Sequence, residues 1–352
     1  MIYTLILLSI VVFYPFSQKT IILENGTLKK KNTKLFSLVI STILISVLGL
    51  RNITVGIDTL GYYESFVRIS YLSINDLFDD VYYEYGYRIL QFSVAILFKE
   101  YQILLIFVAI IYIGAVSMHI YNHSKNSTFS YILFILYGFY TFAFSATRQA
   151  LAIAIILIAY EFIVRNKTTK VFISIVIAAS FHITSLIFIF SFLISKIKLN
   201  KYTIIMITTF TLIIIYFKEQ IFTFLNGLSR IEYSLMDTGG NLLFLFMIMS
   251  VALGIFIKKR FIDPNKNNRT LFYMMCLGII IMPITTFHPV IMRLFYYFFI
   301  FLITYIPNML YSIKNPIIRL FAYFFYTSVG IYFFYTNVIP NANLEDYTFF
   351  WE

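Results

Sequence analysis

Long apolar runs, separated by short polar and charged segments, repeat along the whole chain. An apolar run approaching about 20 residues can cross a bilayer as a helix. The pattern predicts an all-α fold, a single polytopic membrane domain over residues 1–352 with about ten full transmembrane helices. The predicted helices cover 1–16, 35–50, 102–120, 128–146, 148–164, 202–217, 241–257, 271–287, 291–310 and 317–337.

Two further apolar segments do not suit a simple crossing. Residues 86–98 are too short to span, which favours a re-entrant or interfacial segment. Residues 171–195 are long enough, but His182 and Thr184 interrupt them midway. We predict a hairpin of two half-length helices that meet at His182. Irregular backbone at membrane depth is tolerated only where it is buried in protein or lines a cavity.

The distribution of charge gives the predicted orientation. Lysine and arginine gather in cytoplasmic loops of membrane proteins. If 171–195 is a hairpin, six loops on one side of the membrane hold 19 of the 27 basic residues, whereas 13 of the 16 acids lie on the opposite side. The six loops are 17–34, 121–127, 165–170, 195–201, 258–270 and 314–319. We predict that this side is cytoplasmic, that it carries no cluster resembling a site, and that His119 and His123 are surface groups there.

Polar residues scattered along the sequence then meet at the outer membrane boundary. External loops 51–88 and 218–240 are the expected substrate-binding elements, and the first is rich in glycine and tyrosine. Tyrosines at this level form an interfacial belt, and their ring faces also suit sugars. The polar residues expected at this boundary are Arg51, Asp58, Glu84, Arg148, His182, His288 and Arg293.

Composition agrees with a membrane protein and excludes some functions. Hydrophobic residues make up 60% of the chain, charged residues 12%, and the mean hydropathy is +0.84. The net charge of +11 is explained by the cytoplasmic loops, so nucleic acid is not an expected partner. The single cysteine, Cys276, excludes a disulfide within one chain.

Arg148 and Gln149 stand at the start of an otherwise apolar helix that runs to Val164. A charged side chain at mid-bilayer costs about 2.5–3.5 kcal/mol, so an arginine that faces no lipid usually faces a site. Thr147 or Ser145 is the expected cap, and the helix N-terminus would add to an anion site. Alternatively, Arg148 extends to the water interface.

Three arginines at one boundary, Arg51, Arg148 and Arg293, can bind a phosphate or diphosphate through their planar guanidinium groups. Asp58 and Glu84 are candidate bases, or solvated loop acids. His182 could bind substrate or shuttle a proton, or be a buried histidine bonded to a carbonyl. No metal-binding or nucleotide-binding pattern is present, which predicts chemistry without metal or cofactor.

These residues resemble a known family, the EpsG-like branch of the Wzy polysaccharide polymerases. The ordered motifs extend from residue 51 to about residue 300. The residues that carry the resemblance are Arg51, Val55-Gly56-Ile57-Asp58, Tyr62, Glu84-Tyr85-Gly86-Tyr87, Arg148-Gln149-Ala150-Leu151-Ala152, Ala178-Ala179-Ser180-Phe181-His182-Ile183-Thr184-Ser185, Arg293, Tyr296 and Tyr297.

The resemblance implies a metal-independent membrane glycosyltransferase of the GT-C-like, all-helical class. Such an enzyme joins undecaprenyl-diphosphate-linked oligosaccharides outside the bacterial plasma membrane, for O-antigen, capsule or exopolysaccharide. Its implied partners are the bilayer, a flippase and a chain-length regulator. The implied roles are catalysis by Asp58, Glu84 and His182, diphosphate binding by Arg51, Arg148 and Arg293, and sugar or acceptor binding by Tyr62, Tyr87, Gln149, Tyr296 and Tyr297.

Two alternatives remain from the residues alone. A flippase or similar transporter of lipid-linked oligosaccharide should have repeated halves and charges along a path to both faces. An acyltransferase should have a histidine open to a cytoplasmic acyl donor, whereas His182 is predicted to face outward.

Overall fold

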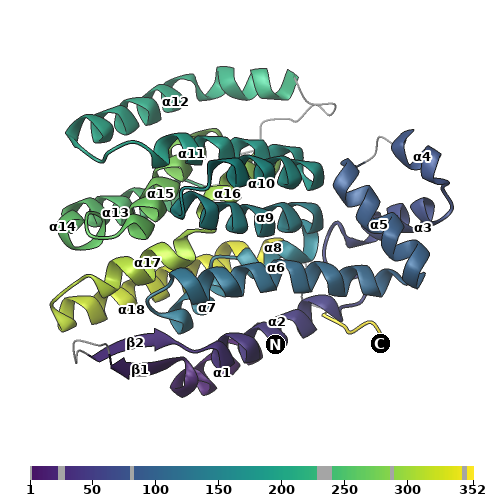
Figure 1. Cartoon of the computed structure of the whole chain (residues 1–352), viewed down its shortest axis with the longest axis horizontal. Helices are drawn as coiled ribbons and strands as arrows, with labels where there is room; N and C mark the ends of the chain where they lie inside the picture. The colour runs from purple at the N-terminus through teal and green to yellow at the C-terminus, as the bar shows by residue number, and fades with distance from the viewer. Residues whose placement is uncertain (1, 23–27, 80–82, 228–239, 286–288, 343–346) are drawn as a thin grey trace.

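The computed structural model describes residues 2–22, 28–79, 83–227, 240–285, 289–342 and 347–352. Within them the chain is almost entirely helical, and one antiparallel sheet pairs β1 (Gln18–Ile22) with β2 (Leu28–Asn32). Figure 1 shows most helices lying side by side, with α12 along one edge. The predicted all-α membrane fold is confirmed.

Among the described residues, six helices are long and apolar enough to cross a membrane. The chain is therefore a multi-pass membrane protein. These helices are α6 (Tyr101–His123), α9 (Thr147–Val164), α12 (Lys201–Gly227), α15 (Lys266–Thr285), the pair α16 (Pro289–Phe299) and α17 (Leu302–Tyr311), and α18 (Pro316–Phe333) with the π-helical turn η3 (Phe334–Val338).

The other apolar helices have 10–17 residues. Because a straight crossing takes about 20 residues, helix length does not confirm the predicted count of ten full spans. These shorter helices are α1 (Ile2–Val12), α2 (Lys34–Gly49), α10 (Thr168–Phe181), α13 (Asn241–Phe256) and the short pair η2 (Ile183–Phe188) with α11 (Ile189–Ser195).

The helix predicted over 128–146 is broken. It consists of α7 (Ser127–Leu136) and α8 (Phe139–Ser145), which are bent by 49° and together would make a seventh span. Gly138 lies between them with a φ of +79°, a conformation that favours glycine. The bend follows from this residue.

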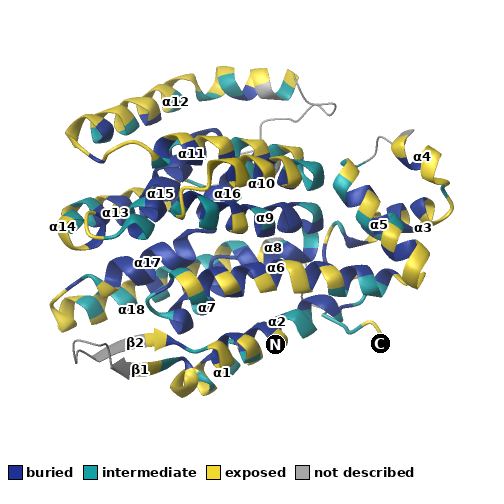
Figure 2. Cartoon of the chain, in the orientation of Figure 1, coloured by how far each residue is buried: buried dark blue, intermediate teal, exposed yellow. Residues whose placement is uncertain are grey.

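Burial separates inner from outer helices, as Figure 2 shows. The apolar window of α15 is 83% buried, whereas that of α12 is 6% buried and that of α18 is 17% buried. Large apolar side chains on α12 and α18 are therefore exposed on the outside of the protein. This arrangement suits a lipid solvent, which leaves no penalty for exposed apolar surface.

The short helices between α2 and α6 lie together at one end of the bundle (Figure 1). The predicted outer loop 51–88 is largely helical, because it contains α3 (Thr59–Ser70) and α4 (Ile74–Asp79). The predicted re-entrant or interfacial segment is α5 (Tyr85–Phe98). Part of the second predicted loop, 218–227, belongs to α12, and 228–239 lie outside the described residues. The remaining short elements are η1 (Tyr14–Phe16), α14 (Lys258–Phe261) and α19 (Ile339–Ala342).

The hairpin predicted over 171–195 is present. The helix α10 ends at Phe181, and His182 is extended, with φ −156° and ψ 111°. The chain then turns back through η2 and α11, so that the rings of Phe172 and Phe192 lie 5.1 Å apart. His182 therefore stands at the apex.

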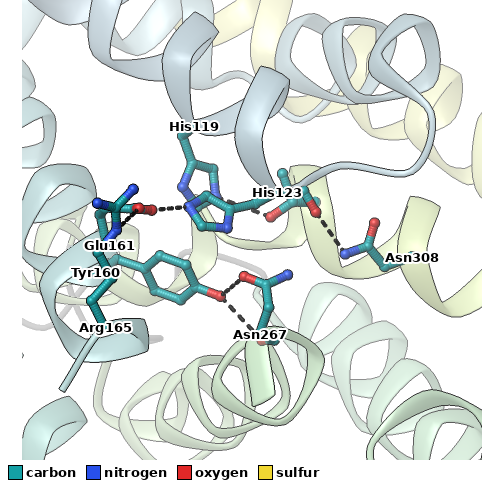
Figure 3. A network of polar contacts seen from close by, with 8 residues as sticks. His119, His123, Tyr160, Glu161, Arg165, Asn267 and Asn308 are labelled. Atoms are coloured by element: carbon teal, nitrogen blue, oxygen red, sulfur yellow. Dashed lines mark hydrogen bonds and ion pairs between the residues drawn. The ribbon is translucent and has the colours of Figure 1, made fainter. Parts of the chain in front are cut away.

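The described residues of the six basic loops lie at the other end of the bundle (Figure 1). Hydrogen bonds join five of these loops: Asn32 to the carbonyl of Ser124 (2.9 Å), Lys266 to Asn166 Oδ1 (2.6 Å) and Lys258 to the carbonyl of Leu199 (2.9 Å). The prediction that His119 and His123 are surface groups is wrong. His119 is buried and contacts Thr304 at 3.0 Å, and His123 contacts Glu161 at 2.6 Å (Figure 3).

Candidate active site

The segment from Arg51 to Asp58 is held against the end of α8. The Arg51 guanidinium donates to the carbonyl oxygens of Leu48 and Phe144, the second at 3.3 Å, and the residue is only 1% exposed. A guanidinium that is buried and donates to carbonyl oxygens is not available to a ligand from outside. The structure therefore separates Arg51 from Arg148 and Arg293, the other two arginines predicted to bind the diphosphate. Arg51 instead holds this segment in place.

Gly56 allows the close approach to α8. Its φ is +101°, and a Cβ there would lie 2.3 Å from the Phe144 carbonyl oxygen. Thr59 Oγ1 donates to the same oxygen at 3.0 Å, and the Ile57 N–H donates to Ser145 Oγ at 3.0 Å. These contacts fix Asp58 at the start of α3, beside the start of α9.

The predicted cap of α9 is wrong. The N-cap position is Ala146, no side chain caps the helix, and Ser145 instead accepts the Ile57 N–H. The first N–H groups of α9 therefore keep their attraction for an anion.

Glu84 is the centre of a polar cluster from three elements. Its Oε2 accepts a hydrogen bond from Arg148 Nη1. Its Oε1 accepts from His182 Nδ1 at 3.1 Å and from the Ile183 N–H at 3.2 Å. The side chains of Glu84, Arg148 and His182 are 12–19% exposed, so the cluster remains accessible at one edge.

The approach of α5 to α10 requires a glycine. A Cβ on Gly86 would lie 2.4 Å from Ser180 Oγ and 2.8 Å from the Ser180 carbonyl oxygen. Without a side chain at this position, Glu84 comes within reach of His182 at the hairpin apex. Glu84 and Gly86 therefore act together: Glu84 supplies the carboxylate, and Gly86 allows α5 to lie close enough to α10 for that carboxylate to reach His182.

Aromatic rings support Arg148. Its guanidinium lies 4.3 Å from the ring centre of Tyr83 and 5.9 Å from that of Tyr62. Tyr62 and Tyr87 contact each other edge to face, and they are 4% and 0% exposed. These two tyrosines are buried behind Arg148 and do not present an open face to a sugar. Tyr83 also belongs to the cluster and is not among the predicted site residues.

A second ion pair lies beside the first. Arg293 Nη2 is 3.3 Å from Asp58 Oδ2, and the two side chains are 33% and 36% exposed. Gln149 donates from Nε2 to the Arg293 carbonyl oxygen, so adjacent residues of α9 contact both groups. His288 lies outside the described residues.

The two tyrosines of α16 point to different partners. Tyr297 Oη lies 3.1 Å from Thr184 Oγ1, which ties α16 to the hairpin. Tyr296 stacks on Phe142 with ring centres 4.4 Å apart, so it packs against α8. Thr184, two residues after His182, also lies at the site, and only the structure shows this.

The neighbours of Glu84 hold its carboxylate in the ionised form. Burial raises the pKa of Glu84, but hydrogen bonds from His182 and the charge of Arg148 outweigh it and bring the pKa to about 2. Glu84 is therefore ionised and a weak base. Because Glu84 occupies Nδ1 of His182, Nε2 is the ring nitrogen left to accept a proton.

The chain was compared with protein families, curated proteins and solved structures. Neither the curated proteins nor the solved structures gave a match. The family model described as the EpsG family matches residues 34–350, a range that includes both ion pairs and the hairpin. This chain therefore belongs to the EpsG family.

Proposed function

We propose that the protein is a polysaccharide polymerase that joins lipid-diphosphate-linked oligosaccharide repeat units at the outer face of the bacterial plasma membrane. The observation that carries the proposal is the meeting of two arginine–carboxylate pairs, Arg148 with Glu84 and Arg293 with Asp58, beside His182. Membership of the EpsG family supports the same function.

The arginines suit the leaving group. As the bond between the sugar and the diphosphate breaks, negative charge grows on the diphosphate, and fixed cations stabilise it without a metal. Arg293 is one-third exposed and paired with Asp58 at 3.3 Å, so it can exchange that contact for a diphosphate oxygen. Arg148 and the uncapped start of α9 add positive potential nearby.

His182 is the proposed base. The acceptor hydroxyl gives its proton to Nε2 while its oxygen forms the new bond to the sugar carbon, and the lipid diphosphate departs with the electron pair of the broken bond. Glu84 accepts from Nδ1, so it orients the ring and stabilises the imidazolium. Asp58 holds Arg293 and is the second candidate to contact the acceptor. A flippase and a chain-length regulator are the proposed partners.

A gene deletion tests this function. Loss of a polymerase should leave single repeat units on the outer leaflet and no long chains. Loss of a transporter, the alternative function, should leave the units in the inner leaflet. Purified protein should also lengthen lipid-linked units without added nucleotide or metal, and failure in both assays would contradict the proposal.

A further inference from the structure

A cavity of about 490 Å³ lies at the end of the bundle that carries the basic loops. It is bounded by the end of α9, the start of α10, the end of α11 and the start of α15. The side chains that give it its character are five cations, Lys167, Lys196, Lys198, Lys266 and Arg269, and an apolar group that includes Phe162, Val171 and Phe192.

The positive charge in this cavity is not balanced by acids. None of its lining residues is acidic. Two nearby carboxylates are already paired, Glu161 with His123 and Arg165, and Asp263 with Lys258. Several cations around one concave space attract an anion more strongly than the same charges on a flat, solvated surface.

Hydrogen bonds connect the helices that form the walls of the cavity. Lys266 Nζ donates to the Ile163 carbonyl oxygen (3.3 Å) and to Asn166 Oδ1, which joins α15 to the end of α9. Tyr273 Oη donates to the Ile197 carbonyl oxygen at 2.7 Å, which joins α15 to the segment after α11.

The network in Figure 3 lies on the same turns of α9 and α15. In it, Tyr160 Oη donates to Asn267 Oδ1 at 2.8 Å. The cavity is therefore preformed, and a ligand would not have to order its walls.

We propose that this cavity is a second binding site, which takes a phosphate-bearing anion with an apolar part, such as the head group of an anionic phospholipid. Ammonium and guanidinium groups bind phosphate oxygens, and the apolar wall suits carbon atoms next to the phosphate. The volume exceeds what one inorganic phosphate fills, and it falls in the usual range of small-molecule sites.

This site is separate from the active site. Arg148 and Ile163 lie at opposite ends of α9, about 22 Å apart at the rise of an α-helix. Between them, α9 is apolar and largely buried from Ala150 to Ala159. Among the described residues, this helix offers no charged path from one site to the other, which a transporter would need.

The test uses full-length protein in phosphatidylcholine nanodiscs. Its thermal unfolding is followed as inorganic diphosphate is added, and again with phosphatidylglycerol in the discs. The pocket variant combines Lys167→Gln, Lys198→Gln and Arg269→Gln, three cations for which the described residues provide no ion pair. The control variant combines Lys259→Gln, Arg260→Gln and Lys314→Gln, which are exposed on the same end and outside the cavity.

We expect stabilisation of the native protein, with an apparent affinity that falls roughly 100-fold in the pocket variant, since each basic residue near an anionic surface contributes about fivefold. The control variant should bind like the native protein. Stabilisation by phosphatidylglycerol alone that is weakened in the pocket variant identifies a lipid head group. Stabilisation by diphosphate alone that is weakened in the pocket variant identifies a soluble anion bound in the cavity and not at Arg148 and Arg293. Equal binding by pocket and control variants, or no stabilisation by either probe, would overturn the proposal.

Discussion

Glu84 holds His182 at the apex of the hairpin, with its Oε1 3.1 Å from Nδ1 of the imidazole. The same carboxylate binds Arg148 through its other oxygen. One acid thus orients both a proposed base and a proposed diphosphate-binding arginine. Its position depends on Gly86, two residues later, and on the apex that interrupts the apolar segment.

Replacement of His182 tests its role as base. We expect His182→Ala to lower the polymerisation rate by roughly 10²- to 10⁴-fold, the usual contribution of a general base. Glu84→Gln should also lower the rate, because the amide cannot stabilise the imidazolium. Chain elongation by purified protein is the measurement. Glu64→Gln, an exposed acid on α3, is the matched control and should retain full activity. Full activity of His182→Ala would transfer the role of base to Asp58.

The pKa of Glu84 predicts a pH dependence of stability. Because its folded pKa is lowered to about 2, its contribution is fully present above the unfolded pKa of about 4.3 and is lost as pH falls through about 2. The native protein should therefore unfold at a higher temperature than Glu84→Gln at every pH from about 5 to 8, with a nearly constant difference. A difference that disappears near neutral pH would show that Glu84 is not ionised in the folded protein.

The arginines can be tested by exchange for lysine, which keeps the charge but loses the planar fork. We expect Arg293→Lys and Arg148→Lys each to lower the rate by roughly 10²- to 10³-fold, as when one charge-stabilising donor is removed. Expression and thermal unfolding of Arg293→Lys should stay native-like because the side chain is one-third exposed. Arg68→Lys, on an exposed position of α3, serves as the control. Normal elongation by both site variants would exclude a role for the fork.

Two glycines near the site should differ in their tolerance of alanine. Gly86→Ala forces a shift of α5 against Ser180, and we expect a loss of about 1–3 kcal/mol of stability together with a loss of activity. Gly61→Ala meets no atom within 4 Å and lies inside α3, so it should be neutral or stabilising by about 0.5–1 kcal/mol. Thermal unfolding of both variants is the measurement. A Gly86→Ala protein as stable as Gly61→Ala would show that α5 and α10 are not held so closely.

Cysteine labelling tests the proposed orientation. In a Cys276→Ala background, a cysteine at Tyr71, which is 85% exposed and directly follows α3, should react with an impermeant reagent from outside. A cysteine at Lys198, in the cavity at the other end, should react only after the membrane is opened. The reverse result would place the active site on the cytoplasmic face.

The membrane class and most helices could be predicted from the sequence alone. A long apolar run must become a helix in a bilayer because its backbone has no water to bond with, and this condition is local. The hairpin at 171–195 followed from the distribution of lysine and arginine, which acts over whole loops. The sequence did not predict the bend between α7 and α8 at Gly138 or the helices inside 51–88, because turn geometry and packing are not visible in hydropathy.

The residues that form the site could be identified only from the tertiary structure. In the sequence, Arg51, Arg148 and Arg293 look alike, since each is a lone arginine near the end of an apolar segment. Packing buries Arg51 against the carbonyl oxygen of Phe144, 93 residues away, whereas Arg148 meets Glu84 and Arg293 meets Asp58 across 64 and 235 residues. Residue type determined which chemistry was available. Contacts between distant segments decided which arginines remain open to a ligand, because burial and pairing depend on neighbours that no local pattern specifies.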